Sequence, residues 1–159
     1  MSTFNRRTAV AALGLSAMTP SIWANATVLT ITQAQAAETS LSLETLLALP
    51  QHSFKTKTPW YPEPVVFSGP LLRDVLKAAG VTQGQRISAV ALDEYKVLIP
   101  FSDATQFDVI LAHRLNGKAL TRRDKGPLFV VYPFDSDPAL QSVKFYERSI
   151  WQLRTLHIQ

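Results

Sequence analysis

The sequence predicts an α+β domain with more strand than helix, built on a mixed and mostly antiparallel sheet. Three observations lead to this class. Many short segments alternate apolar and β-branched residues, the segments with helical spacing are all short, and turn residues separate neighbouring segments. The chain of 159 residues is long enough for one domain, and it shows no internal repeat and no linker.

The first 26 residues predict a secretory signal peptide. Arg6-Arg7 is a basic segment, residues 8–18 are apolar and uncharged, and residues 24–26 fit the small-x-small cleavage rule. The apolar segment is too short to span a membrane. We therefore expect a mature domain over residues 27–159 in the periplasm, with ordinary secretion favoured over twin-arginine export.

Composition excludes several classes of function. The chain contains no cysteine, which excludes disulfides, thiolate metal sites, iron–sulfur clusters and cysteine nucleophiles. Signal-peptide removal would take away two arginines and no acidic residue, so the formal net charge of +4 would fall to about +2. This weak charge, without a basic helix, argues against a nucleic-acid partner.

The first half of the mature chain alternates strand and helix signals. Ser42 is a suitable N-cap for a short helix that Pro50 ends, whereas Pro70 and Gly80 bracket a second helix. Three prolines stiffen a loop over residues 59–64. The other elements expected here are a strand over 27–32 at a possible sheet edge, a loop over 33–39, a helix over 42–49, strands over 52–58 and 65–67, and a helix over 71–79.

The second half is mostly strand. A short connection over residues 93–95 predicts a hairpin, and Asn116-Gly117 is the strongest turn signal in the chain. The elements expected are strands over 86–92 and 96–99, a helical turn over 100–103, strands over 109–115 and 128–132, a turn or short helix from residue 137, and a closing strand over 149–158.

A charged loop precedes the most apolar strand. Residues 122–125 carry two arginines, an aspartate and a lysine, and Gly126-Pro127 separates them from the strand over 128–132. Together with Arg114, these cations could bind a phosphate or carboxylate. A solvated surface loop has the same composition, so both interpretations stay open.

Known catalytic and metal-binding patterns are missing. The three histidines, at positions 52, 113 and 157, have no partner at metal-ligand spacing and are expected to be structural or exposed. The P-loop, Gly-x-Gly-x-x-Gly and Gly-x-Ser-x-Gly motifs are absent.

Two further loop clusters could recognise a flat ligand. Residues 55–61 bring together lysines, threonines and an aromatic pair, Trp60 and Tyr61, which would suit stacking on a heterocycle. Asp93, at the tip of the expected hairpin, could accept hydrogen bonds from an amino-pyrimidine edge. The alternatives are an aromatic side chain folded into the core and an ordinary turn aspartate.

Several motifs follow one another in an order and spacing that covers nearly all of the mature chain. The motifs are Phe-Lys-Thr-Lys-Thr-Pro-Trp at 54–60, Phe-Ser-Gly-Pro-Leu-Leu-Arg-Asp-Val-Leu at 67–76, Ala-Leu-Asp-Glu-Tyr at 91–95, Ile-Leu-Ala at 110–112, Asn-Gly at 116–117, Asp-Lys-Gly-Pro-Leu at 124–128, Tyr-Pro-Phe-Asp at 132–135 and Trp-Gln-Leu at 151–153. With these motifs the chain resembles the small, exported, single-domain members of the oxidoreductase molybdopterin-binding family, which have the sulfite-oxidase-like fold.

This resemblance implies a mixed α+β domain with a pterin held among loops. Trp60 and Tyr95 would stack on the pterin, Asp93 would accept from its amino edge, and Arg123 and Lys125 would hold its side chain or a phosphate. The full set of cofactor-binding residues expected is Thr56, Trp60, Asp93, Tyr95, Arg114, Arg123, Lys125 and Tyr132.

The resemblance also bears on the metal. In catalytic members a cysteine thiolate binds molybdenum, and by spacing from Trp60 the equivalent position here is Thr56. A hydroxyl is a hard ligand and does not replace a soft thiolate, so we expect a pterin or molybdopterin-like ligand without molybdenum.

Three functions remain in competition. Cysteine-free relatives of this kind resemble exported pterin sensors that regulate membrane-bound diguanylate cyclases or phosphodiesterases, so the first is a non-catalytic, periplasmic pterin-binding protein. The second is a molybdopterin-dependent oxidoreductase with a non-cysteine molybdenum site. The third is an interaction module that has lost its ligand.

Overall fold

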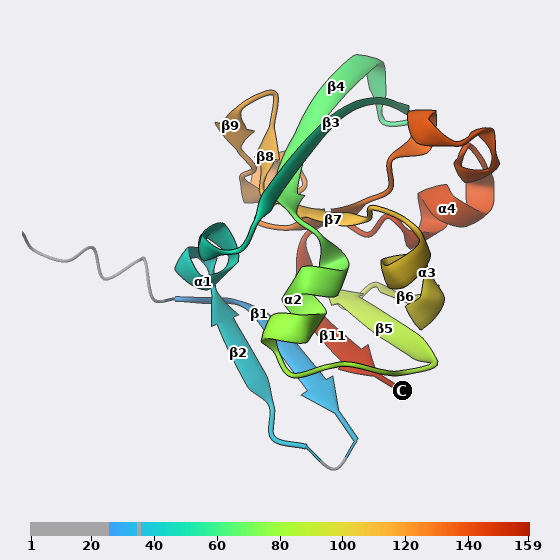
Figure 1. Ribbon diagram of the computed structural model, residues 1–159. Coiled ribbons are helices and arrows are strands. Elements are labelled where there is room, and N and C mark those ends of the chain that lie inside the picture. The colour runs from blue at the N-terminus through green and yellow to red at the C-terminus, as the bar shows by residue number, and fades with distance from the viewer. Residues whose placement is uncertain (1–25, 35) are drawn as a thin grey trace, which may run out of the picture.

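The structure is a computed structural model that describes residues 26–34 and 36–159. The expected signal peptide, apart from Ala26, lies outside these residues and stays a prediction. The described residues form a five-stranded, a four-stranded and a two-stranded sheet. In Figure 1 the first of these lies at the bottom and a long hairpin, part of the second, lies at the top. The predicted α+β class with a mostly antiparallel sheet is confirmed. None of the helices in the described part of the chain is long and apolar enough to cross a membrane.

The five-stranded sheet joins the two ends of the domain. Its order is β2-β1-β11-β5-β6, and only β1 and β11 run parallel. The prediction that the first strand lies at an edge is wrong, because β1 is flanked by β11 and by a strand, β2, that forms within and after the expected loop. The bounds are Thr27–Gln33 for β1, Thr39–Ser42 for β2, Arg86–Ala91 for β5, Lys96–Pro100 for β6 and Leu153–Ile158 for β11.

The second sheet is dominated by a long hairpin. Strand β3, Gln51–Thr58, pairs with β4, Tyr61–Pro70. Strand β4 also pairs with the short strand β8, Arg114–Leu115, which in turn pairs with β9, Lys118–Ala119. The predicted loop over 59–64 is therefore wrong beyond its first two residues. Its prolines are tolerated because β8 pairs with β4 only at Phe67 and Ser68, which leaves the proline end of β4 with a single neighbour.

The predicted strand over 109–115 divides between two sheets. Strand β7, Ile110–Ala112, pairs with β10, Phe129–Val131, whereas β8 turns into the hairpin sheet. The Asn116-Gly117 turn is confirmed, since both residues have positive φ. Gly69 allows β4 to pass β7, because a Cβ there would collide with the Leu111 carbonyl.

The described residues form four short α-helices. The Ser42 hydroxyl caps α1, Leu43–Ala48, by accepting from the Thr45 N–H at 3.1 Å, as predicted. Helix α2 ends before Gly80, which has a φ of 76°. The other bounds are Leu72–Ala78 for α2, Phe101–Gln106 for α3, Val143–Arg148 for α4, and Arg122–Asp124, Phe134–Ser136 and Pro138–Leu140 for the 3-10 turns η2, η3 and η4.

His113 is buried between β7 and β8. Its Nε2 lies 2.8 Å from Oε1 of Gln51, whose amide already donates to the carbonyls of Leu46 and Leu49, so Nε2–H donates. Burial, reinforced by the charge of Arg114, lowers the pKa of His113 below 6.5. The histidine is therefore a structural residue, as its isolation in the sequence predicted.

A pH dependence of stability follows from His113. Because its pKa is lower in the folded state, the unfolded state binds the proton more readily and stability falls as pH drops through 6.5. We expect its ring resonances in NMR to titrate below 6.5. His113→Gln should reduce the decline in urea-unfolding free energy between neutral and mildly acid pH, and an unchanged decline would contradict this role.

Candidate functional site

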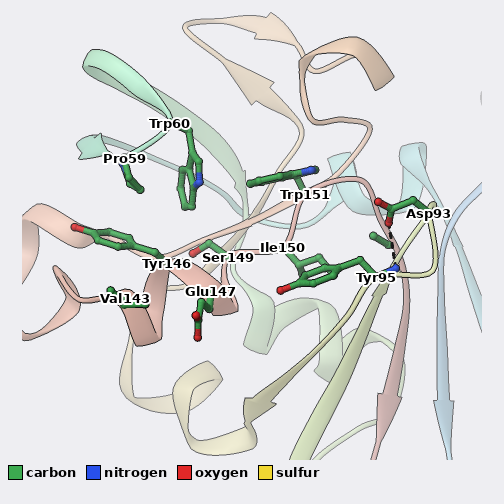
Figure 2. Close-up of a pocket in the computed structure, with 11 residues that line it drawn as sticks. Pro59, Trp60, Asp93, Tyr95, Val143, Tyr146, Glu147, Ser149, Ile150 and Trp151 are labelled. Atoms are coloured by element: carbon green, nitrogen blue, oxygen red, sulfur yellow. Dashed lines mark hydrogen bonds between the residues drawn. The ribbon is translucent and has the colours of Figure 1, made fainter.

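A cavity of about 510 Å³ opens where four segments meet. The β3–β4 turn, the β5–β6 turn, helix α4 and the segment before β11 each contribute side chains, which Figure 2 shows facing one space. Most of the wall is apolar, and its aliphatic part consists of Pro59, Ala91, Val143 and Ile150. This combination of an apolar wall and a few polar groups is typical of a site for a small organic ligand.

Trp60 forms the top of the cavity. It lies at the β3–β4 turn, where its backbone N–H donates to the Thr58 hydroxyl at 3.3 Å. Its ring meets Phe129 and Phe134 of the core at centroid distances of 5.4 and 6.0 Å, both edge-on. The indole is therefore anchored on one side and free to contact a ligand on the other.

Two further rings stand almost perpendicular to Trp60. Trp151 lies 5.9 Å from it with an interplanar angle of 83°, and Tyr146 lies 6.1 Å away at 80°. Tyr95 completes the set from the β5–β6 turn and is about half exposed. Four aromatic side chains from four different segments thus surround the cavity (Figure 2).

Three polar residues also line the cavity. Asp93 accepts from the Tyr95 N–H at 3.1 Å through Oδ1, which fixes the hairpin tip and leaves Oδ2 without a hydrogen-bond partner among the described residues. Glu147 lies on α4, and the Ser149 hydroxyl donates to the Phe145 carbonyl at 2.9 Å. The two carboxylates can therefore accept charge-assisted hydrogen bonds from a ligand.

The charged loop is hydrogen-bonded to Gln152, the residue after Trp151. The Lys125 carbonyl accepts from the Gln152 N–H at 3.0 Å, and the Gln152 amide donates to the Arg122 carbonyl at 2.7 Å. The Lys125 Nζ lies 4.9 Å from the Tyr61 ring centroid and 5.6 Å from that of Trp151. Burial, followed by the charge of Asp124, raises the pKa of Tyr61. Lys125 thus contacts a ring of the cavity without lining it.

The structure brings together three of the eight predicted site residues, Trp60, Asp93 and Tyr95, with Lys125 beside them. Arg114 and Arg123 are exposed and line no part of this cavity. Arg114 donates to the Gly117 carbonyl at 3.4 Å within its own turn, so it supports the turn.

The remaining two, Thr56 and Tyr132, are buried. The Thr56 hydroxyl accepts from the Asp135 N–H at 3.1 Å and donates to the Lys57 carbonyl at 3.3 Å. The Tyr132 hydroxyl donates to Asp103 at 2.7 Å in the core. Burial, together with the charge of Asp103, raises the pKa of Tyr132 far above its usual range. The structure therefore places both side chains away from the cavity.

Sequence reasoning missed Tyr146, Glu147 and Trp151 as site residues. Trp151 belongs to the Trp-Gln-Leu motif at 151–153, and this motif is the sequence signal that marks it. Helix α4 has no side-chain cap and no conspicuous apolar periodicity, so no local signal marked the other two.

The oxidoreductase molybdopterin binding domain matches residues 16–148 of the sequence. The chain belongs to this family.

A solved structure is similar to this chain in fold. The sulfane dehydrogenase SoxCD from Paracoccus pantotrophus has a TM-score of 0.62 and 20% identity, over 82% of this chain and 37% of that chain. The present chain thus spans little more than a third of that protein, and the likeness establishes the sulfite-oxidase-like fold. No curated protein matches the sequence significantly.

The residues present fit the pterin ring of a molybdopterin cofactor but not a thiolate-bound molybdenum. The aromatic rings and the free carboxylate oxygen suit a flat pterin ring. A thiolate-held molybdenum does not fit, because the chain has no cysteine and both hydrogen-bonding directions of the Thr56 hydroxyl are used. No cluster of three histidine or carboxylate ligands occurs among the described residues.

Proposed function

We propose that this protein is a non-catalytic pterin-binding member of the oxidoreductase molybdopterin-binding family that acts as a sensor in the periplasm. One observation carries the proposal: Trp60, Asp93, Tyr95 and Trp151, from distant parts of the chain, line one largely apolar cavity. A family that binds a pterin-type cofactor thus has, in this chain, a cavity suited to a flat ring.

The ring would lie against the aromatic walls. Asp93 would accept hydrogen bonds from its amino-pyrimidine edge, since a carboxylate is an acceptor only. Lys125, next to the Trp151 ring, and the exposed Arg123 would contact a polar or anionic tail that leaves the cavity. Affinity would come mainly from burial of the ring, and specificity from Asp93.

The competing oxidoreductase would need molybdenum held without a thiolate. To decide between the two, we would purify the exported protein and measure bound metal by mass spectrometry and released pterin by fluorescence on one sample. We expect pterin without molybdenum. About one molybdenum per chain together with pterin would establish the oxidoreductase instead, and failure of added reduced pterins to bind would favour an interaction module without ligand.

Substitution of Asp93 tests the proposed contact. Because a hydrogen bond to a charged group contributes roughly 1.5–3 kcal/mol, Asp93→Ala should weaken pterin binding about tenfold or more. Glu63→Ala, at an exposed position of β4 outside the cavity, is the matched control and should leave the affinity unchanged. Isothermal titration calorimetry measures both, and equal affinities of the two variants would remove Asp93 from the site.

The proposed partner is the periplasmic domain of a membrane-bound diguanylate cyclase or phosphodiesterase. The resemblance to cysteine-free exported sensors supports this, as do the exposed apolar side chains of Tyr95, Val143 and Trp151 at the cavity. Affinity capture from membranes, with and without added pterin, tests the partner. Recovery of no cyclase or phosphodiesterase under either condition would reject it.

A further inference from the structure

The charged residues that line the cavity are all acidic. Its two ionisable carboxyl residues, Asp93 and Glu147, are not matched by any lysine or arginine in the lining. The cations nearby have other contacts. Arg148 pairs with Asp103 and Arg154 pairs with Glu94, each at 2.8 Å. The wall of the cavity is therefore acidic although the whole chain is basic.

Two lysines, Lys125 and Lys144, lie close to aromatic rings outside the lining of the cavity. The Lys125 Nζ rests over the rings of Tyr61 and Trp151, and the Lys144 Nζ lies 4.6 Å from the ring centroid of Phe145. Neither lysine lines the cavity. The charged side chains that line the cavity itself are therefore the two carboxylates of Asp93 and Glu147.

The aromatic rings that line the cavity also favour a positively charged ligand. The ring faces of Trp60, Trp151 and Tyr146 point in different directions, because the interplanar angles to Trp60 are 83° and 80° (Figure 2). Tyr95 adds a fourth ring. The face of an aromatic ring carries partial negative charge, and sets of such rings bind organic cations.

We propose that this cavity selects a positively charged flat heterocycle, with its cationic nitrogen among Trp60, Trp151 and Tyr146, over a neutral ring of the same shape. The inference rests on the proposed function in that it takes the same cavity, and it specifies the charge of the ring. The acidic groups act at longer range than the rings, so they add to the preference without direct contact.

A pair of simple probes tests the charge preference. N-methylquinolinium is a bicyclic cation, and lepidine at slightly alkaline pH is a neutral ring of nearly the same shape. Binding of each to the purified exported protein can be followed by the fluorescence of Trp60 and Trp151 and by calorimetry. We expect the cation to bind about tenfold more tightly, as cation–π contacts of partly desolvated rings permit.

Charge-neutralising variants identify the source of the preference. The double variant Asp93→Asn with Glu147→Gln keeps the shape of the side chains and should reduce the preference about threefold through loss of the electrostatic contribution. Glu63→Gln removes one exposed carboxylate outside the cavity and should leave it unchanged. Trp151→Leu should reduce the preference further by removing one ring.

Each outcome bears on one proposal. Equal affinity for both probes, tighter binding of lepidine, or binding of neither would overturn the inference even if pterins bind. A preference that persists unchanged in all cavity variants would also overturn it. Binding of N-methylquinolinium by a protein that binds no pterin would keep the inference and reject the pterin proposal.

Discussion

Trp60→Ala is expected to destabilise the protein by about 3 kcal/mol and to abolish detectable pterin binding. The indole meets four other rings, those of Phe129, Phe134, Tyr146 and Trp151, at centroid distances between 5.4 and 6.1 Å. Truncation would remove core contacts on one side and the top of the cavity on the other. Both effects follow from one side chain, because Trp60 joins the core to the site.

Two variants separate these effects. Trp60→Phe keeps a ring against the core and should lower the free energy of unfolding by only about 1 kcal/mol. It also reduces the aromatic area that a ligand can contact. Leu98→Ala removes an exposed apolar side chain outside the cavity and serves as the control for stability. Urea unfolding gives the stabilities, and calorimetry on folded protein gives the affinities. Unaltered binding by Trp60→Ala would mean that the ligand site lies elsewhere.

Elements defined by local signals could be predicted from the sequence. Helix α1 depends on the Ser42 hydroxyl and on Pro50, and α2 ends at a glycine with positive φ, all within a few residues of the element. The β5–β6 hairpin and the Asn116-Gly117 turn are equally local. Each is determined by sterics and hydrogen bonds that the neighbouring residues provide.

Elements that depend on distant partners could not be predicted. Strand β1 is interior because β11, more than a hundred residues later, pairs with it in parallel. Strand β2 has no strong strand signal of its own and forms because β1 offers a free edge. The split of β7 from β8 likewise reflects the separate pairings with β10 and β4.

The residues of the candidate site also divide into those that local sequence predicts and those that only the fold brings together. The sequence placed Trp60 in a loop between two strands and Asp93 at a hairpin tip, where ligands bind, and both line the cavity. The sequence could not show that helix α4 would face these two segments. Tyr132 had been expected to bind a cofactor, but its hydroxyl lies in the core against Asp103, which is 29 residues away. Only the fold reveals which partner satisfies a buried hydroxyl.

Asp103→Ala is expected to cost about 3 kcal/mol of stability and to weaken ligand binding although Asp103 does not line the cavity. Its carboxylate accepts from the Tyr132 hydroxyl at 2.7 Å and from the Arg148 guanidinium at 2.8 Å. The two charged side chains are only 6% and 18% exposed, so removal of the aspartate would leave a poorly solvated cation without its partner. Arg148 ends α4, the helix that also carries Tyr146 and Glu147.

A second ion pair in the same protein provides the matched control. Arg73 and Asp108 are also 2.8 Å apart, but their side chains are 38% and 68% exposed. Asp108→Ala should therefore cost less than about 1 kcal/mol and leave the affinity unchanged, because solvent replaces the lost partner. Urea unfolding and calorimetry on both variants make the comparison. Similar costs for the two substitutions would show that burial does not distinguish the pairs. Undiminished ligand affinity in Asp103→Ala would show that the cavity does not depend on how α4 is anchored.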